Sequence, residues 1–111
     1  MNARIASLSM AAGLALAGMG ANAAINDGKA QEILGKSACA ACHQLDQKRV
    51  GPTFLEIARK HKGDKDAVAT LMKKVRGGSA GAYGKIPMPP NPPSKISDAD
   101  LKAVVEWVLS K

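Results

Sequence analysis

The stretch Cys39-Ala40-Ala41-Cys42-His43 decides how the rest of this chain is interpreted. Two thiols separated by two residues and followed at once by an imidazole are typical of covalent haem attachment. In such sites each sulfur bonds to a vinyl group of the haem, and the histidine binds the iron. Both cysteines of the chain, Cys39 and Cys42, lie in this motif. The motif therefore predicts one covalently bound haem c, with His43 as an iron ligand and no thiol left over.

The same cysteine pair has three other interpretations. A thioredoxin-like redox site needs strand–helix–strand patterning around the motif, which the flanking sequence does not have. A structural zinc site needs further cysteines or histidines at suitable spacing, and the sequence does not provide them. A disulfide between Cys39 and Cys42 in a non-redox interaction module is the third alternative, and it stays open at this point.

Length and composition limit what the domain can bury. At 111 residues the chain has room for one small domain, and its aromatic residues are Phe54, Tyr83 and Trp107. A buried haem would supply both apolar surface and a covalent cross-link, which small domains commonly need. The net charge of +7 suits an acidic partner, an anionic membrane surface or nucleic acid. Nucleic acid is not expected as a partner, because the lysines are scattered, without an arginine-rich block or interleaved aromatic residues.

The N-terminal residues have the pattern of an export signal. Arg4 provides a basic start, Leu8 to Met19 an apolar stretch, and Ala21-Asn22-Ala23 a cleavage site of small residues. A retained membrane anchor is the alternative, but the apolar stretch is shorter than the roughly 20 residues of a spanning helix. We therefore expect a cleaved signal peptide over residues 1–23, a periplasmic haem domain over residues 24–111, and no stable membrane insertion.

Hydrophobic periodicity predicts an all-α fold of about four helices, with no segment that alternates like a strand. Capping residues and turn residues set the expected ends of the helices, and Pro52 is expected at the first position of the second one. The helices are expected from Asn26 or Asp27 toward Ser37, over Thr53 to Lys60, over Lys65 to Arg76, and after the capping residue Ser97. A long irregular segment, Gly77 to Ile96, separates the last two, and segments of this length are usually functional.

Met88 lies in this irregular segment, within Ile86-Pro87-Met88-Pro89-Pro90-Asn91-Pro92-Pro93. The flanking prolines prevent regular helix and stiffen the backbone, so the segment can hold a weak thioether ligand in place. Met72 lies in an apolar helical stripe and is expected in the core. His61 lies between two lysines and is expected to be solvated. Met88 is therefore the predicted second iron ligand.

The blocks on either side of these ligands resemble those of class I cytochromes c, in particular the small bacterial cytochromes c-551. The resemblance covers Asp27 to Lys111. It is carried by Ala41-Cys42-His43, Val50-Gly51-Pro52, Gly77-Gly78-Ser79-Ala80-Gly81-Ala82-Tyr83-Gly84, Ile86-Pro87-Met88-Pro89-Pro90-Asn91 and Trp107-Val108-Leu109-Ser110-Lys111. It implies a small fold of about four helices around one covalently bound haem, with His43 and Met88 as axial ligands.

The resemblance also implies roles for residues around the haem. The carbonyl of Pro52 would accept the second ring proton of His43, and Asn91 would hydrogen-bond near the Met88 sulfur. Tyr83 stands where these proteins often have a tryptophan that reaches a haem propionate. Lys74 stands where they can have an arginine near a propionate. Two further residues, Leu34 and Trp107, would form the contact between the first and last helices.

The implied function is one-electron transfer, without enzymatic activity. The resemblance favours a soluble, monomeric carrier that donates to a respiratory reductase, such as nitrite reductase, or to a terminal oxidase. A haem protein that binds ligands or reacts with peroxide after displacement of Met88 is the alternative. An acidic docking surface on the redox partner is expected, because the basic side chains together can guide association. The candidates are Lys36, Lys48, Arg49, Lys73, Lys74 and Lys85.

Overall fold

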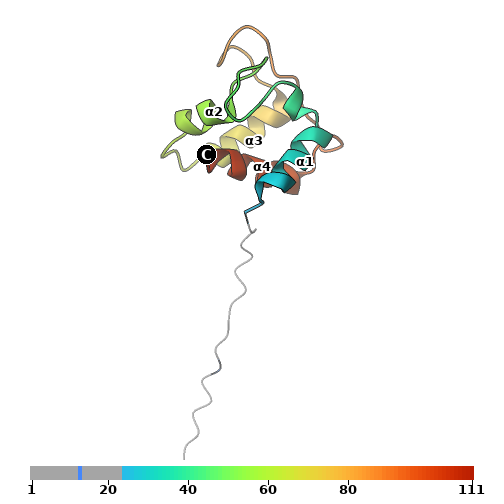
Figure 1. Ribbon diagram of the computed structural model, residues 1–111, viewed down its shortest axis with the longest axis vertical. Helices are drawn as coiled ribbons and strands as arrows, with labels where there is room; N and C mark the ends of the chain where they lie inside the picture. The colour runs from blue at the N-terminus through green and yellow to red at the C-terminus, as the bar shows by residue number, and fades with distance from the viewer. Residues whose placement is uncertain (1–12, 14–23) are drawn as a thin grey trace, which may run out of the picture.

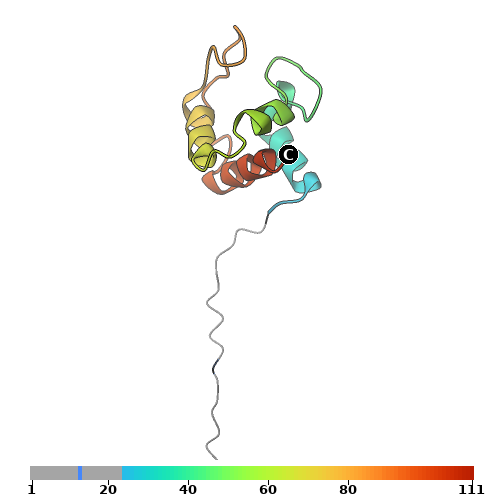
Figure 2. The ribbon, with the colours of Figure 1, turned by 90° about the vertical axis from the view of Figure 1, so that its left-hand side faces the viewer.

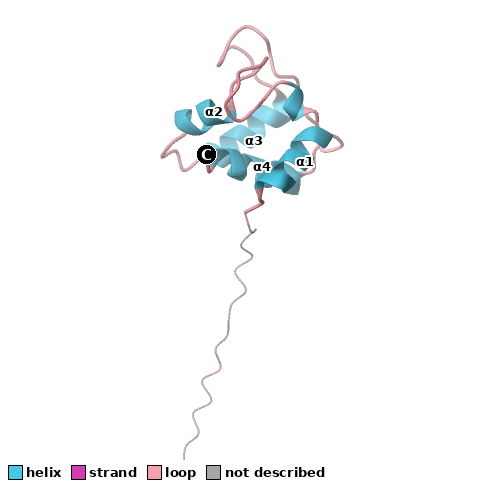
Figure 3. Cartoon of the chain, viewed as in Figure 1, coloured by secondary structure: helices cyan, strands magenta, loops and turns pink. Residues whose placement is uncertain are grey.

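The computed structural model describes residue 13 and residues 24–111, and its described part is all-α, as predicted (Figures 1 and 3). The elements are α1 (Asp27–Lys36), the 3₁₀ helix η1 (Cys39–Ala41), α2 (Phe54–Lys60), α3 (Ala67–Gly77) and α4 (Asp98–Leu109). Apart from Gly13, the expected signal peptide over residues 1–23 lies outside the described residues. Within the described part, no helix has the length and apolar character needed to cross a membrane.

Side-chain caps fix where three helices begin. The Asn26 side chain accepts a hydrogen bond from Lys29 N, and Ser97 accepts one from Asp100 N, so both predicted caps are confirmed. Thr53 forms a capping box with Glu56, because each side chain accepts from the other residue's backbone N–H. The prediction for Pro52 is therefore wrong. It precedes the cap and does not occupy the first helical position.

Helix α3 begins later than the sequence pattern predicted. Asp64 Oδ1 accepts a hydrogen bond from Asp66 N at 2.9 Å, and this local turn competes with helix at Lys65. At the other end the helix includes Gly77 and stops at Gly78, whose φ is +83°. A left-handed residue after the last turn is a common way for a helix to end.

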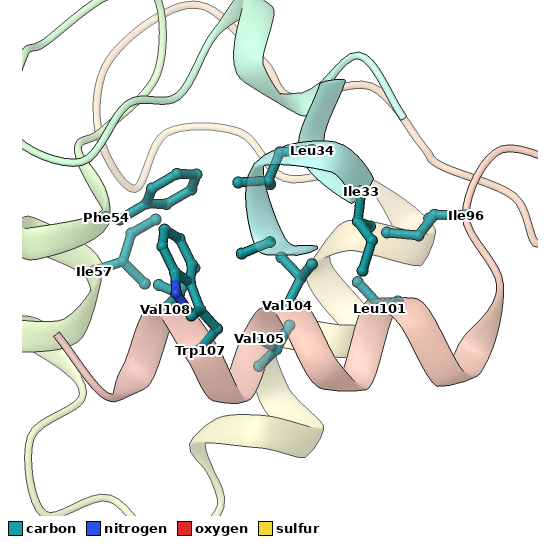
Figure 4. Packing of buried hydrophobic residues seen from close by; sticks show 11 residues of the cluster. Ile33, Leu34, Phe54, Ile57, Ile96, Leu101, Val104, Val105, Trp107 and Val108 are labelled. Atoms are coloured by element: carbon teal, nitrogen blue, oxygen red, sulfur yellow. The ribbon is translucent and has the colours of Figure 1, made fainter. Parts of the chain in front are cut away.

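Helices α1, α2 and α3 all pack against α4, which runs through the middle of the core (Figure 4). Trp107 meets the Phe54 ring edge to face at a centroid distance of 5.6 Å. Leu34 and Trp107 are both buried, and the Trp107 indole also donates to Asp27 of α1 at 2.9 Å. Ile57 of α2 is buried in the same core, whereas Leu109 at the end of α4 is only half-buried.

Two irregular segments lie at the end of the domain opposite the start of α1 (Figures 1 and 2). One joins η1 to α2, and the other, residues 78–97, joins α3 to α4. The views in Figures 1 and 2 agree that both segments rise above the helices on this side. The haem motif adjoins the first segment and Met88 lies in the second, so the fold brings both predicted ligands to this end.

Candidate haem site

The cysteines of the motif are free thiols that face a common cavity. Cys39 and Cys42 form no disulfide, and both are half-buried. Burial raises the pKa of the Cys39 thiol above its usual range. The single-turn helix η1 ends at Ala41 and is capped by Cys42, whose N–H donates to the Cys39 carbonyl at 3.1 Å. Cys39, Cys42 and His43, which this turn brings close together, all line the cavity.

The His43 ring is oriented by Pro52. His43 Nδ1 lies 2.8 Å from the Pro52 carbonyl oxygen, which can only accept, so Nδ1 carries the proton and donates. Nε2 is then left with its lone pair free to bind a metal. Gly51 lies against the same ring, since a Cβ added there would be 2.8 Å from His43 Cε1. Phe54 stacks on the imidazole at a centroid distance of 5.7 Å.

Met88 lines the same cavity, and backbone bonds fix its position. Met88 N donates to Ser79 O at 2.7 Å, and Ser79 N donates to Met88 O at 3.0 Å. This isolated antiparallel bridge joins the proline-rich segment to the residues just after α3. Gly78 lies directly behind it, since a Cβ there would be 2.8 Å from Met88 O. Met72 is half-buried, packs against the core and does not line the cavity.

Asn91 is buried near Met88, but its amide makes other contacts than the resemblance implied. Asn91 Nδ2 donates to Val75 O at 3.2 Å and to Pro89 O at 2.9 Å. An amide nitrogen has two protons, and both are used by these carbonyls, which leaves none for the Met88 sulfur. In this structure Asn91 therefore holds the backbone next to Met88 rather than the sulfur itself.

Tyr83 has a buried hydroxyl without a hydrogen-bond partner. The side chain lines the cavity, and burial together with nearby Glu56 raises the pKa of the phenol. Lys60 Nζ lies 4.5 Å from the centroid of the Tyr83 ring. Lys74 is half-buried and also lines the cavity. A buried donor with no partner at a cavity wall is suited to an acidic group on whatever fills that cavity.

Three further residues, His61, Lys95 and Arg76, have surroundings that the sequence did not predict. The His61 side chain is 9 % exposed and its Nε2 has no partner, so the prediction of a solvated histidine is wrong. It lies in the turn after α2, away from the haem cavity. Lys95 lines the cavity. Arg76 bonds to the proline-rich segment. Because its prolines leave that segment short of N–H donors, the sequence could have predicted that a donor side chain from elsewhere bonds to it.

The residues present fit a covalently bound haem. Most of the cavity wall is aliphatic or aromatic, with contributions from every helix; it includes Leu34, Val50, Phe54, Ile57, Leu71, Val75, Ile86, Leu101, Val104, Val105 and Val108. Cys39, Cys42, His43 and Met88 all line this cavity. Among the described residues, no three His, Cys, Asp or Glu side chains gather to hold a metal ion.

Four helices around an apolar cavity, with the Cys-x-x-Cys-His motif and Met88 in its wall, define a class I cytochrome c. The chain belongs to this family, because the family model for cytochrome c matches residues 28–111. Cytochrome c2 of Rubrivivax gelatinosus is 51 % identical over 78 residues, which are 70 % of this chain and 92 % of that protein. Cytochrome c-551 of Azotobacter vinelandii is 41 % identical over 80 residues, which are 72 % of this chain and 94 % of that protein.

The crystal structure of Nitrosomonas europaea cytochrome c552 has the same fold. It matches with a TM-score of 0.67 and 45 % identity, over 72 % of this chain and 96 % of that one. The predicted fold class and the resemblance to small bacterial cytochromes c are therefore confirmed. Membership also implies one covalent haem c on Cys39 and Cys42, and the family consists of electron carriers rather than enzymes.

Proposed function

We propose that this protein is a periplasmic one-electron carrier in which His43 and Met88 would both bind the haem iron. The observation that carries the proposal is the shared cavity, which is lined by both the attachment motif and Met88. The haem supplies a metal that cycles between ferric and ferrous states, and a thioether ligand favours the ferrous state and raises the potential. The protein's part is to hold both ligands in both states, so that little moves when an electron is transferred.

Several residues have proposed roles in holding the haem. Cys39 and Cys42 would form the thioether bonds. The Pro52 carbonyl would fix the orientation of the His43 ring by accepting the 2.8 Å hydrogen bond from Nδ1. Tyr83 would donate its unpartnered hydroxyl to a propionate, and Lys74 would add a positive charge there. Asn91 would hold the backbone beside Met88 by its bonds to Val75 and Pro89.

The exposed surface near the cavity supports a transient redox encounter. Val50 and Ile86 line the cavity and are 48 % and 67 % exposed, so an apolar area lies at its mouth. Of the basic residues expected to guide docking, Lys74 is half-buried and five are exposed: Lys36, Lys48, Arg49, Lys73 and Lys85. We propose a monomeric carrier whose partner has an acidic docking surface, either a respiratory reductase such as nitrite reductase or a terminal oxidase. Added salt should slow electron transfer to such a partner.

Export remains part of this proposal. Arg4 and the apolar stretch before Ala23 support cleavage after residue 23, which would leave residues 24–111 as the mature haem domain. Mass measurement of protein purified from a periplasmic extract tests the cleavage site directly. A mature chain that still begins at Met1 would contradict it.

The iron ligands can be tested spectroscopically. The purified protein should keep its haem through acid-acetone extraction, show the weak red absorption of a ferric iron–thioether bond, and resist CO when reduced. Met88→Ala should keep the haem but lose that absorption, and its potential should fall by a sizeable part of the roughly 0.8 V range that axial ligands span. Ready CO binding by the unmodified protein would support the alternative in which Met88 is displaced. Loss of haem on extraction would contradict covalent attachment.

A further inference from the structure

Arg76 is the next-to-last residue of α3, and its guanidinium group makes three hydrogen bonds to the chain that follows Met88. Its Nη1 donates to Asn91 O at 3.0 Å and to Ile96 O at 2.7 Å. Its Nη2 donates to Asp98 Oδ1 at 2.6 Å. The Arg76 side chain is 22 % exposed, whereas Asp98 is 82 % exposed. Of the three hydrogen bonds, the two to carbonyl oxygens are therefore less exposed to solvent than the one to Asp98.

The segment that Arg76 contacts is short of hydrogen-bond donors. Prolines occupy positions 87, 89, 90, 92 and 93, and proline has no N–H. Each of these residues still has a carbonyl oxygen, so acceptors outnumber donors. Asn91 and Ile96 are themselves 6 % and 3 % exposed, and an unpaired carbonyl in a buried residue is costly. Arg76 supplies the donors that the segment's own backbone lacks.

The contacts of Arg76 lead directly to Met88. The Asn91 carbonyl bonds to Arg76, and the Asn91 amide bonds to Pro89, the residue after Met88. On the other side, Met88 is joined to Ser79 by two backbone bonds. Both sets of contacts come from the end of α3 and the residues just after it. Arg76 does not line the cavity, so it can affect Met88 only through the backbone.

We propose that Arg76 is a positioning residue for Met88. By holding the Asn91 and Ile96 carbonyls, it lowers the fraction of molecules in which the segment lifts and an external ligand replaces the methionine sulfur. This proposal rests on the proposed function, in which Met88 binds the iron. It also gives a physical reason why the alternative activity, ligand binding after loss of Met88, would be suppressed in this chain.

Competition by imidazole for the ferric iron tests the proposal in the haem-loaded protein. The Arg76→Gln variant keeps a side chain of similar length but loses the charge and the fork of donors. Because charge-assisted hydrogen bonds to two buried carbonyls are lost, its affinity for imidazole should rise about tenfold or more. Arg76→Lys keeps the charge and should give an intermediate affinity. Asp98→Asn removes the exposed ion pair only and should change the affinity least.

Ala30→Gly is the matched control. Ala30 is fully buried in α1 and does not line the cavity, so this variant loses global stability without touching the segment. Wild-type affinity for imidazole in Arg76→Gln would overturn the proposal, as would an equal rise in Ala30→Gly. If the Arg76→Gln variant does not accumulate with haem, the Arg76→Lys variant provides the test. An imidazole affinity in Arg76→Lys that equals that of the unmodified protein would then overturn the proposal. Absence of the thioether absorption from the unmodified protein would instead contradict the proposed function.

Discussion

The His43 side of the cavity is built from residues that are close together in the sequence. The Met88 side depends in addition on contacts between residues that lie farther apart along the chain. On the His43 side the supporting bonds join residues within 42–54: Gly51 N donates to Cys42 O, and His43 Nδ1 donates to Pro52 O. On the Met88 side the pairing of Met88 with Ser79 is equally local, but Asn91 Nδ2 reaches back 16 residues to Val75 and Arg76 Nη1 bonds to Ile96, 20 residues ahead. Short loops lose less entropy when they close, so the His43 side is held at lower cost.

This difference predicts which side opens first. The His43 side keeps its geometry as long as one short segment stays folded. The Met88 side needs both the end of α3 and the proline-rich segment to be in place, so local unfolding of either one frees the methionine. We therefore expect disturbances of the Met88 side to expose the iron to external ligands, and disturbances of the His43 side to lower stability without doing so.

Gly78→Ala should have the largest effect. Gly78 has a φ of +83°, and a Cβ there would be 2.8 Å from the Met88 carbonyl oxygen. Left-handed backbone and a clash with backbone together should cost about 2–4 kcal/mol of unfolding free energy. Denaturant unfolding of the haem-loaded protein measures the loss. CO binding to the reduced variant should also become measurable, because the strain falls on the Met88 side.

Gly63→Ala is the matched control for this substitution. Gly63 has a similar φ of +78°, but a Cβ there would meet nothing within 4 Å. The Gly63→Ala variant should therefore lose only the unfolding free energy that left-handed backbone costs an alanine, about 1–2 kcal/mol. Its reduced form should still not bind CO. Equal stability losses in the two variants would mean that the Met88 backbone moves away from the new methyl group freely, which would contradict a tightly held Met88 side.

Gly51→Ala should disturb the His43 side with a smaller loss. A Cβ there would lie 2.8 Å from His43 Cε1 and 3.2 Å from Cys42 O. The ring is held by Pro52 and cannot turn away, so overpacking should cost about 1–3 kcal/mol in denaturant unfolding. The reduced variant should still resist CO, because Met88 is untouched. CO binding as fast as in Gly78→Ala would remove the distinction between the two sides.

Gly35→Ala serves as the control for Gly51→Ala. Gly35 lies in α1 with nothing within 4 Å of an added Cβ, so alanine there should stabilise the protein by about 0.5–1 kcal/mol. The two glycine substitutions should thus have opposite signs. A loss of stability in Gly35→Ala would mean that the effect at Gly51 does not report on His43.

Tyr83→Phe tests the remaining polar group in the cavity, and the sign of its effect is diagnostic. If the Tyr83 hydroxyl donates to a haem propionate, its removal should lower the unfolding free energy of the haem-loaded protein by about 1–2 kcal/mol. If the hydroxyl stays without a partner, as it is among the protein atoms alone, its removal should be neutral or stabilising. A neutral result would therefore contradict the propionate contact.

The sequence predicted the His43 side better than the Met88 side for the same physical reason. The attachment motif and the Pro52 carbonyl lie within one short stretch, so the spacing and the family pattern together placed the ring. The four helices followed from periodicity and capping residues. The start of α3 was predicted too early, because the Asp64 turn competes with helix at a position where propensity gives no warning.

The contacts that support Met88 could not be predicted from the sequence. Which carbonyl Asn91 uses depends on how far α3 extends and on how the segment folds back to α4. The shortage of N–H groups in the proline-rich segment predicts that a side-chain donor is needed there, but it does not single out Arg76, whose position beside Asn91 and Ile96 is seen only in the structure. His61 was misjudged similarly, because lysines on both sides suggested exposure whereas the turn after α2 buries its side chain.

The smallest effect is expected at Asp27, which belongs to neither the His43 side nor the Met88 side of the cavity. Substitution there is therefore a reference for the substitutions on both sides. The Asp27 carboxylate accepts from Trp107 Nε1 at 2.9 Å and from Lys111 Nζ at 3.0 Å, which ties α1 to the end of α4. These contacts, the Trp107 bond first, hold the pKa of Asp27 below its usual value near 3.8. A lowered pKa contributes stability above the pKa of the unfolded chain, and that stability is lost as pH falls through the folded value.

Asp27→Asn should therefore lose stability near neutral pH and show a shallower decline below about pH 4 than the unmodified protein. Denaturant midpoints measured from neutral to acidic pH give the decline of stability with falling pH for the variant and for the unmodified protein. Glu32→Gln is the control, because Glu32 lies in the same helix in an exposed 3.6 Å pair with Lys29 and should change neither. Imidazole affinity should stay constant in both variants. A rise in Asp27→Asn would mean that contact between the terminal helices also controls Met88, and that the Met88 side is not held by α3 alone.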